Sequence, residues 1–421
     1  MVNRVFMIAY HYPPVRVSSG LQRTLVFSRE LSKYGWQPQV LTVHPRAYIA
    51  ISNDQLTDIP NDVLVKRAFA LDASRHLSFK GKYPSLLALP DRWSSWWFGG
   101  VWSGLQLIRK NSTKVIWSTY PIATAHLIGL TLQRLTGLPW VADFRDSMTD
   151  TEYPQPGLRR KIYLWIEKKT VETCTSAVFT TPSTLEMYRN RYPDVSGDKW
   201  LLMPNGYNEE IFEEIESDER FCRKQLELKE KQCRPLVFVH SGVIYPDERD
   251  PMPFFEALAL LKKQNLIAAS DLKIILRATG HDDVFRPLLA NLNISDIVQL
   301  EAGIAYRDAL KEMLLADGLI IFQAANCNHQ VPAKIYEYFR AQKPIIAFTD
   351  TNGDTASLLS NLGFSDIAPL DNVELIQDVL IGFIKKIKVG SAVIAKPEAV
   401  IKHSRQTTVI DLAACFNSAN I

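Results

Sequence analysis

The amino-acid sequence predicts an α/β protein with two doubly wound parallel sheets. Short apolar runs alternate with longer amphipathic segments along the whole chain, as consecutive βαβ units require. The alternation begins with the run 4–10 and, after a charge-rich stretch, starts again at 235–240. A chain of 421 residues is also long enough to bury two separate cores.

In the first half of the chain, strands and helices follow one another in turn. Apolar residues recur at helical spacing over 21–34, and Gly35 supplies the left-handed residue with which many helices end. Residues 44–90 show no regular pattern. The other elements expected are strands at 4–10, 37–43, 115–118, 177–181 and from Trp140, a helix closed by Gly137 and a basic helix at 158–174.

The second half repeats this organisation. A polar helix at 218–231 precedes its first strand. The later strands are short apolar runs of the kind that parallel sheets bury on both faces. The expected elements are strands at 235–240, 272–277, 297–300, 318–322 and 345–348, with helices at 252–263 and 306–315.

Composition excludes several classes of protein. Hydrophobic content of 47% and charged content of 22% are ordinary for a globular chain. Five scattered cysteines without a C-x-x-C pair indicate a reducing compartment, no disulfide framework and no zinc site. No apolar run is long enough to cross a membrane, and the N-terminal run is too short for a signal peptide. We therefore expect a cytoplasmic protein.

Charge is distributed unevenly. Residues 1–200 contain 25 Lys and Arg against 15 Asp and Glu, whereas the remainder contains 23 against 30. A basic first half suggests an anionic partner, and no nucleic-acid-binding motif accompanies it. Four tryptophans lie close to basic residues in this half: Trp93, Trp96, Trp97 and Trp102. They indicate either peripheral contact with the inner face of the plasma membrane or ordinary packing of a loop and a helix.

The most informative stretch is 331–354. Lys334, Glu337 and Tyr338 are spaced to share one helix face, near the start of the helix. A cation beside a carboxylate suits a nucleoside diphosphate, because Lys can hold the diphosphate and Glu can accept both ribose hydroxyls. The spacing alone equally fits a solvated Lys–Glu pair. A second glycine-bearing turn, with Gly353 and Thr355, precedes a helix and could cradle phosphate.

The strings P-A-K-I-Y-E-Y and A-Q-K-P-I-I-A in this stretch resemble the donor-binding segment of family-four glycosyltransferases. These are retaining enzymes with the GT-B fold, in which two Rossmann-like domains face each other across a cleft. W-V-A-D-F-R-D (140–146) resembles the branch that acts in bacterial surface-polysaccharide synthesis, including lipopolysaccharide, and P-N-G-Y-N (204–208) resembles the exit from the first domain.

The resemblance implies three parts and a reaction. The parts are an acceptor-side domain at 1–205, a nucleotide-sugar-binding domain at 206–400, and a C-terminal helix at 401–421 that returns to the first domain. The reaction is transfer of a sugar from a nucleotide-sugar donor to a hydroxyl of a glycan or lipid-linked acceptor, with retention. No metal and no cofactor are expected, because the nucleotide-sugar is a substrate.

The resemblance also implies roles for particular residues. Arg249, Lys334, Arg145 and Asp146 would serve catalysis, and the donor would be bound by Gly20, Gly242, His329, Glu337, Gly353 and Thr355. Gly20 belongs to a small-residue loop before a helix that resembles a phosphate-binding turn. A surface Arg249 and an internal ion pair of Arg145 with Asp143 and Asp146 are the structural alternatives.

The chain departs from the family pattern at two positions. The family places a glutamate where this chain has His329, and other branches place a histidine where it has Arg145. The first change leaves open whether the protein is active and which sugar it takes. Two other functions therefore stay open: a non-catalytic scaffold that binds a nucleotide-sugar in a glycan-synthesis complex, and a sugar-nucleotide epimerase on the same fold.

Overall fold

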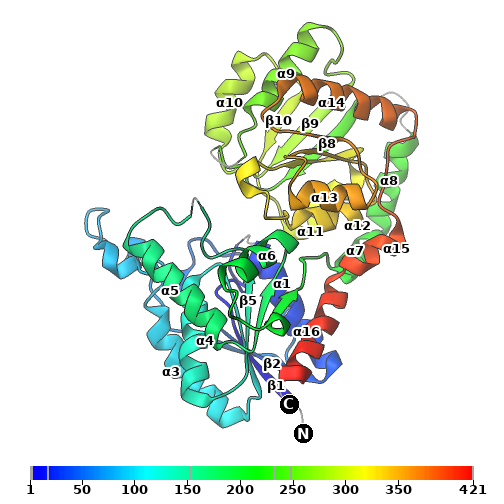
Figure 1. The fold of residues 1–421 in the computed structure, drawn as a ribbon. Coiled ribbons are helices and arrows are strands. Elements are labelled where there is room, and N and C mark those ends of the chain that lie inside the picture. The colour runs from blue at the N-terminus through cyan, green and yellow to red at the C-terminus, as the bar shows by residue number, and fades with distance from the viewer. Residues whose placement is uncertain (1–2, 17–18, 152, 231–233, 247–248, 420–421) are drawn as a thin grey trace. The chain divides into compact units, whose positions relative to one another are not determined.

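The computed structural model describes residues 3–16, 19–151, 153–230, 234–246 and 249–419 (Figure 1). The chain divides into two compact units. The first comprises Met1–Asn205 together with Arg405–Ile421, and the second comprises Gly206–Ser404. Each unit contains one parallel sheet with helices packed on both faces, so the predicted fold class of two Rossmann-like domains is confirmed.

The sheet of the first unit has seven strands in the order β3-β2-β1-β4-β5-β6-β7, and all neighbouring pairs are parallel. Its strands are β1 (Asn3–Ile8), β2 (Trp36–Val43), β3 (Leu64–Ala68), β4 (Val115–Thr119), β5 (Trp140–Arg145), β6 (Ser176–Phe179) and β7 (Trp200–Leu202). The longer helices are α1 (Ser19–Glu30), α3 (Trp96–Asn111), α4 (Ala123–Thr136), α5 (Leu158–Thr173), α6 (Pro182–Arg191) and α16 (Arg405–Ala419). Short helical turns are η1 (Leu31–Tyr34), η2 (Pro45–Ala47), α2 (Ala73–His76), η3 (Ser85–Ala88) and η4 (Gly197–Lys199).

The two faces of this sheet bury separate cores. Side chains alternate along a strand, so Val5 and Met7 of β1 face one core while Phe6 and Ile8 face the other. The first core includes residues of α1 and α16, and the second includes residues of α3, α4, α5 and α6. Every residue of β1 from Val5 to Ile8 is fully buried, which explains why the run is apolar without interruption.

Helix α16 packs on the first unit. The Trp36 indole Nε1 donates a hydrogen bond to Asn417 Oδ1 at 3.0 Å, and the Trp36 ring meets Phe416 edge-on. The returning segment begins at Arg405 rather than at 401. Ser404 still pairs with Tyr207 of the second unit, and the His403 ring packs against Tyr336.

The sheet of the second unit has six strands in the order β10-β9-β8-β11-β12-β13, again parallel throughout. Its strands are β8 (Leu236–Ser241), β9 (Leu272–Arg277), β10 (Val298–Glu301), β11 (Gly318–Phe322), β12 (Ile345–Phe348) and β13 (Ile367–Ala368). Its helices are α7 (Glu209–Glu216), α8 (Glu219–Glu230), α9 (Met252–Lys263), α10 (Asp282–Asn291), α11 (Tyr306–Leu315), α12 (Lys334–Arg340), α13 (Asp354–Asn361), α14 (Val373–Lys388) and α15 (Pro397–Val400), with turns η5 (Ala325–Cys327) and η6 (Ile401–His403).

The sequence pattern missed two strands of the first unit, β3 and β7, and one strand of the second, β13. Strand β3 lies inside the stretch 44–90, which showed no regular pattern, and it pairs only with β2 at the edge of the sheet. Its first four residues alternate between exposed and partly buried and only Ala68 is buried, so the strand carries little apolar signal.

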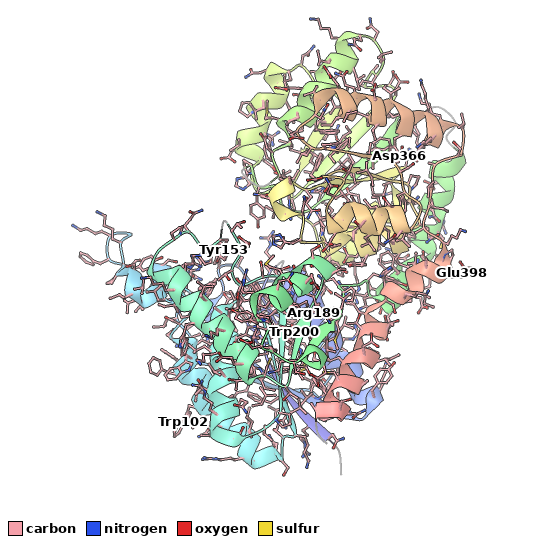
Figure 2. The ribbon with its side chains drawn as sticks, in the orientation of Figure 1. Trp102, Tyr153, Arg189, Trp200, Asp366 and Glu398 are labelled. Carbon is pink, nitrogen blue, oxygen red and sulfur yellow. The ribbon has the colours of Figure 1, made fainter. Side chains whose placement is uncertain are left out.

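The tryptophan cluster is mostly internal. Trp96 is fully buried, Trp93 donates to the Ala47 carbonyl at 3.1 Å, and Trp97 donates to Thr131 Oγ1 at 2.9 Å. Trp102 is different: 69% of it is exposed, and its side chain points outward from α3 (Figure 2). Packing therefore accounts for three of the four tryptophans. Within the part of the chain that the structure describes, none of the helices has the length and hydropathy of a membrane span.

Candidate functional site

The topology of each sheet marks a place for a ligand. Open α/β sheets bind ligands beyond the carboxyl ends of their strands, where the strand order changes direction. In the second unit this switch lies between β8 and β11, and in the first unit between β1 and β4. The residues predicted for a site are divided between the two units.

In the second unit, Lys334 meets a histidine at the end of β8. The Lys334 Nζ atom lies 3.0 Å from His240 Nε2, and His240 Nδ1 lies 3.0 Å from the Ile320 carbonyl oxygen. A carbonyl can only accept, so Nδ1 is the protonated nitrogen and Nε2 accepts from the Lys334 amine. This histidine fixes the position of the Lys334 amine.

Positive charge gathers at this point. Burial, and then the neighbouring Arg249 charge, lower the pKa of Lys334 well below its usual value, and Glu337 partly opposes this shift. Burial and the Lys334 charge likewise lower the pKa of His240. Arg249 donates through Nη1 to the Val243 carbonyl at 3.2 Å, while its buried Nε has no partner among the described residues. An anion would relieve the mutual repulsion of these groups.

A glycine makes room for the lysine. Gly242 has a φ of +119°, which side-chain-bearing residues rarely adopt, and a Cβ there would lie 3.0 Å from Lys334 Nζ. The loop after β8 is also tied to α12, because the Ser241 N–H donates to the Tyr338 hydroxyl at 3.2 Å. Lys334 and Tyr338, which the sequence spacing placed on one helix face, both contact the end of β8 and the loop after it.

Glu337 lies one helical turn after Lys334. Only 7% of it is exposed, and its Oε1 accepts a hydrogen bond of 2.6 Å from the Tyr306 hydroxyl at the start of α11. A carboxylate this buried is not the solvated partner in a surface ion pair. The structure thus brings Gly242, Arg249, Lys334 and Glu337 to the switch point of one sheet.

The loop that leads from β11 to α12 is fixed by hydrogen bonds from Gln323 and Thr355. Gln323 donates through Nε2 to the carbonyls of Cys327 (2.7 Å) and Gln330 (2.9 Å). The hydroxyl of Thr355, which is buried, donates to the same Gln330 carbonyl at 3.1 Å. His329 is partly buried within this loop. Thr355 therefore helps to position this loop.

Gly353 caps α13 next to Asn328. A Cβ on Gly353 would lie 2.9 Å from Asn328 Oδ1, and the Asp354 N–H donates to the Asn328 carbonyl at 2.8 Å. Asn328 Nδ2 in turn donates to Asp350 Oδ2 at 2.7 Å. The N-terminus of α13 is thus packed against the loop that contains His329.

In the first unit, Gly20 and Arg145 come together. A Cβ on Gly20 would lie 2.5 Å from Arg145 Nη1 and 3.1 Å from His11 Nδ1. Arg145 ends β5 with a φ of +58°, and Nη1 donates to the Tyr120 carbonyl at 3.3 Å. Burial, and then the Arg145 charge, lower the pKa of His11 to about 3, so its ring is neutral.

The internal ion pair considered for Arg145 is formed by another residue. Arg23 of α1 pairs with Asp143 through Nε (2.8 Å) and Nη2 (3.4 Å), and its Nη1 donates to the Pro204 carbonyl at 3.0 Å. Asp146 is only partly buried and makes no ion pair with Arg145 in the described part of the chain. Asp143 therefore serves the fold through Arg23.

Sequence reasoning missed four residues of these sites: His11, Arg23, His240 and Tyr306. His240 was visible as a polar residue at the end of an apolar strand, and Arg23 as a basic residue in the first turns of a helix. Their partners lie 94 and 120 residues away along the chain, respectively. No group of three or more His, Cys, Asp or Glu side chains suited to a metal ion occurs among the residues described.

Comparison with known proteins yields structural likeness only. No family model matches the sequence, and no curated protein matches it. Among solved structures, sucrose-phosphate synthase from Thermosynechococcus elongatus is similar, with a TM-score of 0.70, 14% identity, and coverage of 99% of this chain and 98% of that one. Anabaena HepE in complex with UDP-glucose gives 0.66 at 12% identity, with 99% of each chain covered. WaaG, a glycosyltransferase involved in lipopolysaccharide biosynthesis, gives 0.61 at 14% identity, with 99% and 98% covered. These likenesses establish that the chain has the GT-B fold.

Proposed function

We propose that this protein is a glycosyltransferase whose second unit binds a nucleotide-sugar donor. The observation that carries the proposal is the group of Lys334, Arg249 and His240 at the switch point between β8 and β11, one helical turn from the buried Glu337. The positive charges of Lys334 and Arg249 suit a diphosphate, and the Glu337 carboxylate suits the two adjacent hydroxyls of a ribose. The fold shared with HepE, solved with UDP-glucose, supports the same ligand class.

In the proposed reaction, the bond between the anomeric carbon and the donor diphosphate breaks while an acceptor hydroxyl oxygen bonds to that carbon, and the hydroxyl proton passes to the leaving diphosphate. Negative charge builds up on the leaving diphosphate. Lys334 and Arg249 would stabilise that charge from fixed positions, which lowers the barrier more than mobile water could. We propose that the configuration at the anomeric carbon is retained, in keeping with the resemblance of the 331–347 stretch.

The ribose contact can be tested without knowing the sugar. We expect wild-type protein to bind UDP more tightly than 2′-deoxy-UDP, and Glu337→Gln to lose most of this preference, because a hydrogen bond to a charged group contributes about 1.5–3 kcal/mol. Titration calorimetry with UDP and with 2′-deoxy-UDP measures this preference. Glu256→Gln, at an exposed position of α9 in the same unit, is the matched control. Equal preference for UDP in wild type and Glu337→Gln would contradict the assignment.

We further propose that the first unit approaches a lipid-linked or surface-glycan acceptor at a membrane. Phe98 (70% exposed), Trp102 and Arg109 are spaced at i, i+4 and i+11 along α3, so they share one face of that helix. Exposed aromatic side chains beside a basic residue favour the boundary of a bilayer with acidic lipid.

Vesicle co-sedimentation tests this surface. We expect wild-type protein to sediment with vesicles containing acidic phospholipid, and the double variant Phe98→Ser/Trp102→Ser to lose most of that binding. Leu266→Ser is the control, because Leu266 is equally an exposed apolar residue but belongs to the second unit. Undiminished sedimentation of the double variant would refute the membrane proposal and leave donor binding unaffected.

A further inference from the structure

At the switch point of the first sheet, the buried guanidinium of Arg145 forms no ion pair with any carboxylate in the part of the chain that the structure describes. Arg145 is 4% exposed. Among the described residues, the guanidinium donates one hydrogen bond, from Nη1 to the Tyr120 carbonyl, and its buried Nε has no partner. The backbone at Arg145 is fixed from the next strand, because Thr180 donates to the Arg145 carbonyl through both N–H (3.3 Å) and Oγ1 (2.8 Å).

The nearby carboxylates do not neutralise this charge directly. Asp143 forms its ion pair with Arg23, and the electrostatic interaction of Asp146 with Arg145 is of longer range. Burial lowers the pKa of Arg145; Asp146 and Asp143 oppose that shift, while Arg23 and Arg405 add to it. His11 is neutral and therefore supplies no negative charge. An isolated buried cation is costly unless an anion accompanies it.

The start of α1 adds a second element that attracts anions. This helix begins at Ser19 and runs for 12 residues to Glu30. Gly20 lies in its first turn, and a Cβ there would lie 2.5 Å from Arg145 Nη1, so a larger residue would displace the guanidinium. The first-turn N–H groups of a helix have no partner within the helix, and its dipole is positive at that end. Arg145 therefore reaches the end of the helix that favours negative charge.

We propose that Arg145 and the first turn of α1 form an oxyanion site that takes a carboxylate or phosphate carried by a sugar substrate. The planar guanidinium fork suits both groups, since each presents two oxygens in one plane. Arg145 and α1 belong to the first unit, whereas Lys334 and Arg249, proposed to hold the diphosphate, belong to the second. The anion site itself rests on the contacts of Arg145 and α1. Only the claim that its ligand is a sugar substrate rests on the proposed glycosyltransferase function.

Binding measurements on the full chain test the site with defined probes. Glucuronate and glucose 6-phosphate are each compared with glucose, without nucleotide, and UDP-glucuronate is compared with UDP-glucose. For wild type we expect at least one acid-bearing probe to bind about tenfold or more tightly than its neutral counterpart. Arg145→Gln should remove this preference while leaving UDP affinity unchanged. Arg134→Gln, at an exposed arginine of the same unit, should keep it.

The pattern of results identifies the source of the acid group. A preference confined to UDP-glucuronate assigns an acidic donor sugar, and a preference for glucose 6-phosphate or glucuronate assigns an acidic acceptor. Either supports the site. Wild type with no acid preference in any pair, or a preference that survives in Arg145→Gln, overturns it. If Arg145→Gln does not fold, Arg145→Lys tests the same acid preference independently, because it keeps the positive charge but loses the planar guanidinium. Failure of every nucleotide-sugar to bind, with the acid preference intact, would contradict the glycosyltransferase proposal alone.

Discussion

Lys334→Met is expected to lower the affinity for the nucleotide-sugar by roughly 100-fold and to leave the ligand-free protein as stable as wild type. The affinity falls because one charged hydrogen bond to the diphosphate contributes about 1.5–3 kcal/mol, and the Arg249 charge then acts alone. Stability is preserved because the buried Lys334 amine is repelled by Arg249 in the ligand-free state. Titration calorimetry and thermal unfolding measure the two effects. Lys263→Met, at an exposed lysine of α9, is the control.

The same residue makes binding depend on pH. Burial and Arg249 lower the pKa of Lys334 in the free protein, and a bound diphosphate would raise it again. Donor binding therefore takes up a proton at pH values between the pKa of Lys334 in the free protein and its higher pKa in the complex, and affinity falls as the pH rises through this window. Calorimetry in buffers of different ionisation enthalpy detects this proton. Proton uptake of equal size in Lys334→Met would contradict the assignment.

Glu167→Ala is expected to destabilise the first unit by about 3–5 kcal/mol, which is the usual cost of breaking a buried ion pair. Glu167 is fully buried on α5, and each carboxylate oxygen accepts two hydrogen bonds. The donors are Arg191 Nη1 (2.6 Å), the hydroxyls of Tyr188 and Tyr192 (both 2.7 Å) and Thr149 Oγ1 (2.8 Å). Removal of the carboxylate leaves the Arg191 charge and three hydroxyls without their shared acceptor.

The control for this variant lies on the same helix. Glu172→Ala removes a carboxylate that pairs with Lys169 near the surface of α5, where ion pairs contribute about 1 kcal/mol or less. Differential scanning calorimetry should show the unfolding transition of Glu167→Ala lowered by roughly 10 °C, and that of Glu172→Ala nearly unchanged. Similar shifts for the two variants would mean that the buried network does not hold α5 and α6 together.

The fold was predictable because its signals are local. Buried parallel strands such as 318–322 and 345–348 consist of apolar residues bounded by turn residues, and the structure assigns the same bounds to β11 and β12. Gly35 and Gly137 end their helices with a positive φ, as their positions indicated. Strand β3 was missed because an edge strand needs only a weak apolar pattern.

The sites were harder to predict because their residues are distant in the sequence and become neighbours only through the order of the strands in the sheet. The spacing of Lys334 and Glu337 is local and was readable, but nothing in the sequence near Lys334 indicates that His240 accepts its hydrogen bond. In the same way, the neighbourhood of Asp143 suggested Arg145 as its partner, whereas the structure pairs it with Arg23. Such contacts follow from which strands are neighbours, and this order emerges only when the sheet forms.

The most direct test of the central claim is titration of the wild-type protein with UDP-glucose and, in parallel, with GDP-, dTDP- and ADP-glucose. We predict saturable binding of one nucleotide-sugar per chain, competition by its free nucleoside diphosphate, and loss of the signal in Lys334→Met. Absence of binding by every nucleotide-sugar, or binding that Lys334→Met leaves unchanged, would contradict a donor site at the switch point of the second sheet.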